Sequence, residues 1–307
     1  MGRGSHTGFN FHRPLNENRY ARLVKFAIVG AFIPTEELLP LAVAADQLGY
    51  HSFCVGDHVV DLETISTPYP YEADGSRRWD SECEWPDPWV LFAAMGAVTQ
   101  QLTFFTSIYV SALRSPYQVA KSVGTAAVLT GGRVRLGVGA GWCTEEFELL
   151  GQDFESRGRR TDADLARLRE LWENDWVDGP RLTMRPRPEQ RVPILVGGMT
   201  AVALRRAARY DGWVGDVSST EDAVGIATRL REIREQTGEA DRPPATVIAA
   251  LNDALLPADF ERAEAGGVTD VMTQPWMYYY GRKATLEQKI DGMERFAKDV
   301  LKPLAGL

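Results

Sequence analysis

The sequence is short of metal-binding residues and of long apolar runs. Its 307 residues include only 3 cysteines and 4 histidines, with no H-E-x-x-H or H-x-H pair. A metal site is therefore disfavoured, and so few cysteines are expected to be free thiols rather than a disulfide framework. No segment approaches the roughly 18 uninterrupted apolar residues of a membrane-spanning helix, so we expect no membrane partner.

Positive charge and the common hydrolase motifs are also scarce. The 34 Lys and Arg face 42 Asp and Glu, and the resulting net charge of -8 disfavours nucleic acid as a partner. There is no G-x-S-x-G elbow and no Walker loop, which removes the commonest hydrolase and nucleotide-triphosphatase classes. A globular protein of enzyme size is the expectation, and we expect its substrate to be a small molecule.

The first 22 residues are polar and rich in arginine, and they lack the apolar core of a signal peptide. We expect a cytoplasmic protein. Residues 1–22 would then be a flexible N-terminal arm, an oligomer contact or a remnant of cloning, and the sequence does not choose among these.

The chain has enough hydrophobic residues, 44%, for a large core, and its apolar runs alternate with helical patterns. Strands are expected at 23–29, 51–55, 102–110, 133–138, 193–196, 213–214, 246–250 and 268–272. Helices are expected to start after Thr35, at Asp87-Pro88, at Ser115-Pro116 and after Thr200, with further ones at 157–176, 221–236, 258–265 and 286–301. This alternation predicts an α/β protein, a single (β/α)8 TIM barrel over residues 23–307 with an insertion loop. Two smaller domains, or an open sheet around the irregular strands between 176 and 216, are the alternatives.

The residues that follow the strands form the working face of such a barrel. Asp57 and His58 follow the second expected strand, and an imidazole beside a carboxylate suits acid–base catalysis because imidazole titrates near neutral pH. The alternative is structural: the Asp caps the next segment and the His faces solvent.

Two glycine segments offer backbone amides to a ligand. Gly137, Gly139 and Gly141 precede Trp142, but the spacing is not the G-x-G-x-x-G dinucleotide fingerprint. Close packing of the loop on the barrel wall is the alternative. Gly197-Gly198, before a helix capped by Thr200, suits a phosphate, with a plain strand-to-helix turn as the alternative.

The long irregular segment from 57 to 88 is rich in Pro, Tyr, Glu and Trp. The loop from Tyr69 to Trp89, which includes Trp79 and Trp85, is interpreted either as a lid over an apolar or planar ligand or as a dimer contact. The arginines of 157–169 are expected to form a solvated helix face. Arg157, Arg159 or Arg160 would reach substrate in the alternative.

Several motifs, in this order, resemble the bacterial luciferase-like superfamily, most closely its F420-dependent oxidoreductase branch. They are GDH at 56–58, TSIYV at 106–110, the run at 114–142, EEF at 145–147, and PILVGG with DGW between 193 and 213. The resemblance covers about residues 24 to 300. It implies a (β/α)8 barrel with an insertion that binds FMN or the deazaflavin coenzyme F420, and by family habit a homodimer.

The resemblance also implies a site. Asp57 and His58 would lie beside the deazaflavin ring, which a cis peptide at Ser107–Ile108 would back. Gly139, Ala140, Gly141 and Trp142 would contact the ring and tail of the cofactor. Val196, Gly197, Gly198 and Met199 would contact its phosphate. Glu145 is the last residue expected to bind the cofactor. The glucose-6-phosphate dehydrogenases of this branch have Glu where this chain has Trp142, so a sugar phosphate is disfavoured.

The expected reaction is hydride transfer between F420 and an organic carbonyl, alcohol or activated double bond. His58 would give or take the proton, and Asp57 would shape the cofactor site. An FMN-dependent monooxygenase that uses O2 is the alternative. A relative that has lost its chemistry and serves as a binding protein is a third.

Overall fold

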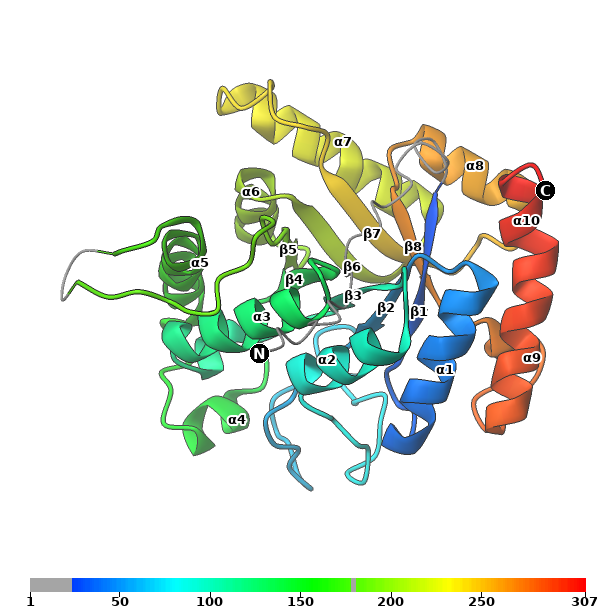
Figure 1. Cartoon of the computed structure of the whole chain (residues 1–307), viewed down its shortest axis with the longest axis horizontal. Coiled ribbons are helices and arrows are strands. Elements are labelled where there is room, and N and C mark those ends of the chain that lie inside the picture. The colour runs from blue at the N-terminus through cyan, green and yellow to red at the C-terminus, as the bar shows by residue number, and fades with distance from the viewer. Residues whose placement is uncertain (1–23, 178–180) are drawn as a thin grey trace, which may run out of the picture.

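Eight parallel strands close into a barrel in the order of the sequence, as the computed structural model shows for residues 24–177 and 181–307 (Figure 1). They are β1 (Lys25–Val29), β2 (Ser52–Val55), β3 (Thr103–Thr106), β4 (Val134–Val138), β5 (Ile194–Gly197), β6 (Gly212–Ser218), β7 (Thr246–Leu251) and β8 (Asp270–Thr273). The expected (β/α)8 barrel is confirmed, and the open sheet is wrong. The interpretations of residues 1–22 lie outside the described residues and stay predictions.

Helices surround the barrel and cover its outer face (Figure 1). They are α1 (Thr35–Leu48), α2 (Pro88–Val98), α3 (Pro116–Leu129), α4 (Thr144–Leu149), α5 (Arg157–Glu173), α6 (Ala201–Arg209), α7 (Thr220–Gln236), α8 (Pro257–Ala265), α9 (Leu286–Phe296) and α10 (Lys302–Leu304). The short α4 was not expected, because six residues after a glycine loop show too little periodicity. No helix in the described ranges is long and apolar enough to cross a membrane.

Helix starts follow the local chemistry with one exception. Asp87 caps α2 by accepting two backbone N–H bonds of 2.9 and 3.0 Å, and Thr200 caps α6 by accepting one, from the N–H of Ala203 at 3.2 Å. Thr35 does not cap α1. It is the first helical residue, and its N–H donates to Glu84 Oε2 of the insertion loop at 2.7 Å.

Side chains alternate between the inside and the outside of the barrel, so the interior is layered. The middle layer is apolar, and the layer at the N-terminal ends of the strands is polar. There Arg135 Nη1 donates to Asp270 Oδ1 at 2.8 Å and Arg135 Nη2 to Ser52 Oγ at 2.8 Å. The middle layer consists of Ala27, Cys54, Phe105, Leu195, Val214, Ile248 and Met272. These layers fill the barrel and leave its C-terminal end for a site.

The expected insertion is the segment between β2 and α2, which forms neither helix nor strand from Gly56 to Asp87. Drawn in light blue to cyan, it lies below α1 and α2 in Figure 1. The three cysteines are free thiols, as expected.

Candidate active site

A cavity of about 660 Å³ lies at the C-terminal ends of the strands, under the insertion loop. Its size is within the usual range of small-molecule sites. The predicted site residues that line it are Asp57, His58, Ser107, Ile108, Gly141, Trp142, Gly197 and Gly198. Those that do not line it are Gly139, Ala140, Glu145, Val196 and Met199. Eight of the thirteen predicted residues therefore meet in one place.

His58 is oriented by a glutamate that the sequence argument missed. Its Nδ1 lies 3.0 Å from Oε2 of Glu146, a residue only 2% exposed. Glu146 Oε1 also accepts the N–H groups of Val59 at 2.6 Å and Val60 at 3.3 Å. A carboxylate at Nδ1 favours a proton there, which leaves Nε2 as the nitrogen that exchanges protons. His58 therefore does not simply face solvent, the structural alternative.

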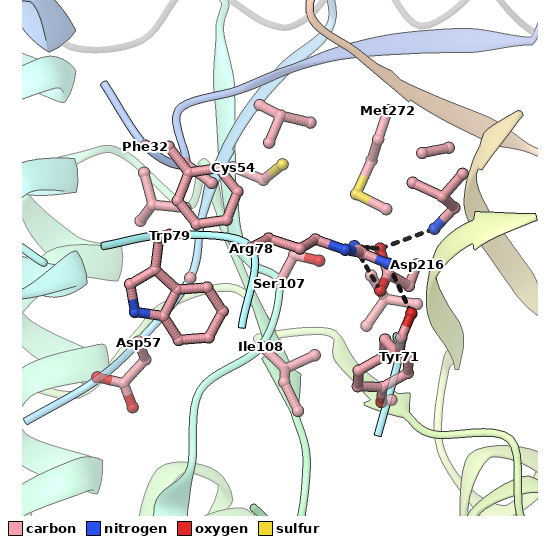
Figure 2. A pocket seen from close by; sticks show the side chains of 18 of the residues that line it. Phe32, Cys54, Asp57, Tyr71, Arg78, Trp79, Ser107, Ile108, Asp216 and Met272 are labelled. Carbon is pink, nitrogen blue, oxygen red and sulfur yellow. Dashed lines mark hydrogen bonds and ion pairs between the residues drawn. The ribbon is translucent and has the colours of Figure 1, made fainter. Parts of the chain in front are cut away.

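The carboxylate of Asp57 pairs with Arg114 and not with His58. Its two oxygens accept a bidentate bond from Arg114, at 2.7 and 2.8 Å, and Oδ2 also accepts the N–H of Val110 at 3.0 Å. Burial raises the pKa of Asp57, while Arg114 and the Val110 N–H oppose that rise. In Figure 2 Asp57 lies at the edge of the pocket, below Trp79. Its contacts tie the end of β2 to the segment after β3.

The peptide bond between Ser107 and Ile108 is cis, as the resemblance implied. Glycines make room for the residues around it: a Cβ on Gly139 would lie 1.7 Å from Ile108 Cδ1, and a Cβ on Gly137 would lie 1.9 Å from the Thr106 carbonyl oxygen. The packing alternative thus accounts for these two glycines. Gly141 is also closely packed, since a Cβ there would lie 2.7 Å from Val110 and from Phe147, but it has in addition a φ of 88° and lines the cavity.

Aromatic rings form one wall of the cavity, which we call the aromatic wall. Its members are Phe32, Tyr69, Trp79, Trp85 and Trp142. Trp79 is central, with ring centroids 5.2 Å from Trp85, 5.3 Å from Tyr69 and 5.7 Å from Phe32. The centroid of His58 is 4.8 Å from that of Trp85. Because the loop's rings turn toward the cavity, the lid interpretation is favoured over the dimer contact.

Trp89 is not part of that wall. It lies in α2, is 3% exposed, and packs on Tyr109 with ring centroids 5.4 Å apart. Its position one residue after the helix start places it on the core side of α2, so grouping it with the loop aromatics was wrong.

Glu145 contacts the insertion loop instead of the cavity. Oε1 accepts the N–H groups of Ser66 and Thr67 at 2.7 and 2.9 Å, and Oε2 accepts the Thr67 hydroxyl at 2.8 Å. Although burial opposes it, these hydrogen bonds lower the pKa of Glu145. Two adjacent glutamates of α4 thus hold two different parts of the same loop.

The arginines of α5 are neither purely solvated nor in the cavity. Arg157 Nε donates to the Gly141 carbonyl at 3.2 Å, and Arg160 Nη2 donates to the Arg114 carbonyl at 3.1 Å. Through these two contacts the arginines hold the glycine loop and the segment that carries Arg114. Among the described residues, no three His, Cys, Asp or Glu side chains gather into a metal-binding group.

Comparisons with known proteins show the family of the chain. A family model described as luciferase-like monooxygenase matches residues 17–265. The chain belongs to this family. An uncharacterized protein of Mycobacterium tuberculosis is 34% identical over 287 residues, 91% of this chain and 99% of that protein.

Two further similar proteins are named for F420. An F420-dependent glucose-6-phosphate dehydrogenase of Nakamurella multipartita is 29% identical over 67% of this chain and 59% of that protein. The structure of an F420-dependent secondary alcohol dehydrogenase with an F420-acetone adduct is similar in fold, with a TM-score of 0.70 at 15% identity over 92% of this chain and 99% of that one. This chain thus belongs to a luciferase-like oxidoreductase family and has an F420-dependent dehydrogenase among its homologues.

One ion pair crosses the mouth of this luciferase-like barrel. Arg78, from the insertion loop, donates from Nη1 to both oxygens of Asp216 in β6, at 2.8 and 2.9 Å. Its Nε bonds Glu72 at 2.5 Å, and its Nη2 bonds the Tyr71 carbonyl at 3.0 Å. Figure 2 shows the Arg78 side chain running between Met272 and Ser107 to reach Asp216. No motif pointed to this pair.

We expect Asp216→Asn to loosen the insertion loop. An ion pair that is partly exposed contributes up to about 1 kcal/mol, so its loss should speed cleavage of the loop by chymotrypsin about fivefold. Asp175→Asn is the control, since Asp175 pairs with Arg185 on the exposed surface. Equal cleavage rates for Asp216→Asn and the wild type would show that the pair does not hold the loop.

Proposed function

We propose that this chain is an F420-dependent oxidoreductase that transfers a hydride between the coenzyme and an organic carbonyl, alcohol or activated double bond. The observation that carries the proposal is the His58–Glu146 pair, at 3.0 Å, in the cavity at the C-terminal ends of the strands. His58 would thus be a proton donor with a fixed orientation, at the end of the barrel where enzymes of this architecture have their active sites. The F420-dependent relative at 29% identity supports the cofactor.

The residues present fit such a cofactor. The cavity is large enough for a tricyclic ring, and Thr273, which also lines it, has a buried hydroxyl with no hydrogen-bond partner among the described residues. We expect Ser107–Ile108, Gly141 and Trp142 to hold the ring, and Gly197–Gly198 at the start of α6 to hold the phosphate. The bound deazaflavin would supply or accept the hydride.

The protein's own part is to move a proton and to exclude water. His58 would give a proton from Nε2 to the substrate oxygen during reduction, or take it during oxidation. Glu146 would fix the orientation and the tautomer of the imidazole ring. The aromatic wall would keep water from the reacting atoms. Asp57 would act only through structure, by holding the segment that follows β3.

An FMN-dependent monooxygenase is the second candidate, favoured by the description of the family model that matches the chain. A relative without chemistry is opposed by the intact His58–Glu146 pair. The homodimer and the cytoplasmic location stay predictions.

Isotope labels separate the two enzymatic candidates. The protein is given a panel of aldehydes and ketones under ¹⁸O₂, in one reaction with F420 reduced with deuterium at C5 and in a parallel reaction with reduced FMN. Deuterium on the carbinol carbon of the product supports hydride transfer. Incorporation of ¹⁸O into a product formed with reduced FMN, without deuterium transfer from F420, would replace the proposal with the monooxygenase.

A further inference from the structure

Aromatic side chains line the part of the cavity around His58. Three of the five rings of the aromatic wall lie close to the imidazole of His58, with centroids 4.8 Å (Trp85), 5.4 Å (Trp79) and 6.1 Å (Trp142) from it. The Trp79 ring is itself buried, 8% exposed. Rings placed edge-on and face-on around a space favour a flat, apolar guest, since offset and edge-to-face contacts then form on several sides.

The charges that line the cavity are already paired with protein groups. Asp57 pairs with Arg114, Glu146 with His58, Arg78 with Asp216, and Lys289 with Glu37. Arg282, exposed at the rim, is the one charged lining residue for which the described part of the chain offers no ion-pair partner. A charged group on a substrate beside the aromatic wall would thus be desolvated without a counter-ion, which is unfavourable.

The aromatic wall also carries polar hydrogens that have no protein acceptor among the described residues. The Tyr69 hydroxyl has no hydrogen-bond partner within the described residues, and burial raises its pKa, so it stays a phenol and a donor. Trp85 Nε1 is buried and also lacks an acceptor there, whereas Trp79 Nε1 donates to Asp61 at 3.1 Å. The wall therefore offers hydrogen-bond donors but no free charge.

We propose that the substrate is an uncharged, planar aromatic or conjugated carbonyl compound, or the corresponding alcohol, held by the aromatic wall against His58. This rests on the proposed function. In the reducing direction the carbonyl carbon receives a hydride from the reduced deazaflavin, which is oxidised, and the carbonyl oxygen receives a proton from His58. The product is the neutral alcohol, and the reverse reaction returns both.

Binding of three ketones tests the substrate class without any cofactor. Acetophenone is flat and neutral, 4-acetylbenzoate adds one carboxylate, and cyclohexyl methyl ketone is neutral but not flat. Each is titrated into the full chain and followed by tryptophan fluorescence and by saturation-transfer NMR. We expect acetophenone to bind at least about tenfold more tightly than the other two. Equal or tighter binding of 4-acetylbenzoate or of cyclohexyl methyl ketone, or no saturable binding of acetophenone, would overturn the proposal.

Variants locate the binding. Trp142→Leu should weaken acetophenone binding about tenfold, because one face of the guest loses its ring contact. Trp176→Leu is the matched control, since Trp176 is 53% exposed and does not line the cavity. Equal affinity in Trp142→Leu and Trp176→Leu would place the ketone elsewhere and contradict the proposal. Because F420 is absent from these titrations, a failure of the coenzyme to bind would overturn the proposed function and leave this result intact.

Discussion

Replacing His58 with Ala is expected to lower the turnover of F420-dependent ketone reduction about 10²–10⁴-fold, the usual effect of losing a general acid. His58 Nδ1 is held by Glu146 at 3.0 Å, so the other ring nitrogen is oriented before substrate arrives. The affinity for F420 should change little, because the proposed ring contacts come mainly from other residues. Steady-state kinetics and an F420 titration on the same variant check both statements.

The two adjacent glutamates provide a matched pair for this claim. Glu146→Gln should lower kcat while F420 still binds, because a neutral amide holds the imidazole ring and its Nδ1–H tautomer less firmly than a carboxylate does. Glu145→Gln should leave kcat nearly unchanged, since Glu145 holds Ser66 and Thr67 and not His58. Unchanged turnover in His58→Ala, or equal effects of the two glutamine variants, would remove the pair from the mechanism.

The second large effect is on stability and lies at the opposite end of the barrel. Asp270→Asn is expected to lower the free energy of unfolding by about 3–5 kcal/mol, because it leaves the Arg135 charge buried without its partner. Asp270 is 2% exposed and accepts 2.8 Å bonds from Arg135 and from Thr269. Urea unfolding followed by circular dichroism measures the loss.

An exposed pair is the control for that variant. Arg229 and Glu232 are paired at 2.9 Å and both are about half exposed. Glu232→Gln should therefore cost less than about 1 kcal/mol. A similar small loss in Asp270→Asn would show that the buried pair contributes no more than a surface pair.

The polar layer around Arg135 also makes the free energy of unfolding depend on pH. Burial lowers the pKa of His51 to about 3, with a further contribution from Arg135. The unfolded chain takes up a proton on this residue below about pH 6.5 while the folded chain does not. Its contribution is therefore complete above that pH and is lost as the pH falls toward 3.

Asp270 also makes the folded state less stable as the pH falls. Although burial opposes it, Arg135 lowers its pKa, so its contribution is present above the unfolded value near 4 and is lost as the pH falls further. Unfolding free energies measured from pH 7 to pH 4 should decrease steadily. A constant value over this range would contradict the account of His51.

The fold was predictable because its signals are local. Alternating apolar runs set the barrel, and Asp87 and Thr200 mark helix starts that depend only on the next three residues. Thr35 was misplaced because its backbone N–H binds Glu84, a residue 49 positions away. No local pattern contains that contact.

The site was predictable only in part, for the same reason. The sequence indicated His58 and the EEF motif, but which of two adjacent glutamates turns inward depends on where the short α4 begins, and the motif itself does not say. Likewise, Asp57 was expected to sit beside His58, while its partner Arg114 comes from a segment 57 residues later. The Arg78–Asp216 pair joins residues 138 positions apart and leaves no trace in the sequence.

Side-by-side equilibrium titration of the purified chain with F420 and with FMN tests the central claim most directly, since it needs no knowledge of the substrate. The account predicts that F420 binds with a Kd of about a micromolar or below, and that FMN binds at least about 100-fold more weakly. FMN binding at a micromolar or below, with no binding of F420, would contradict it.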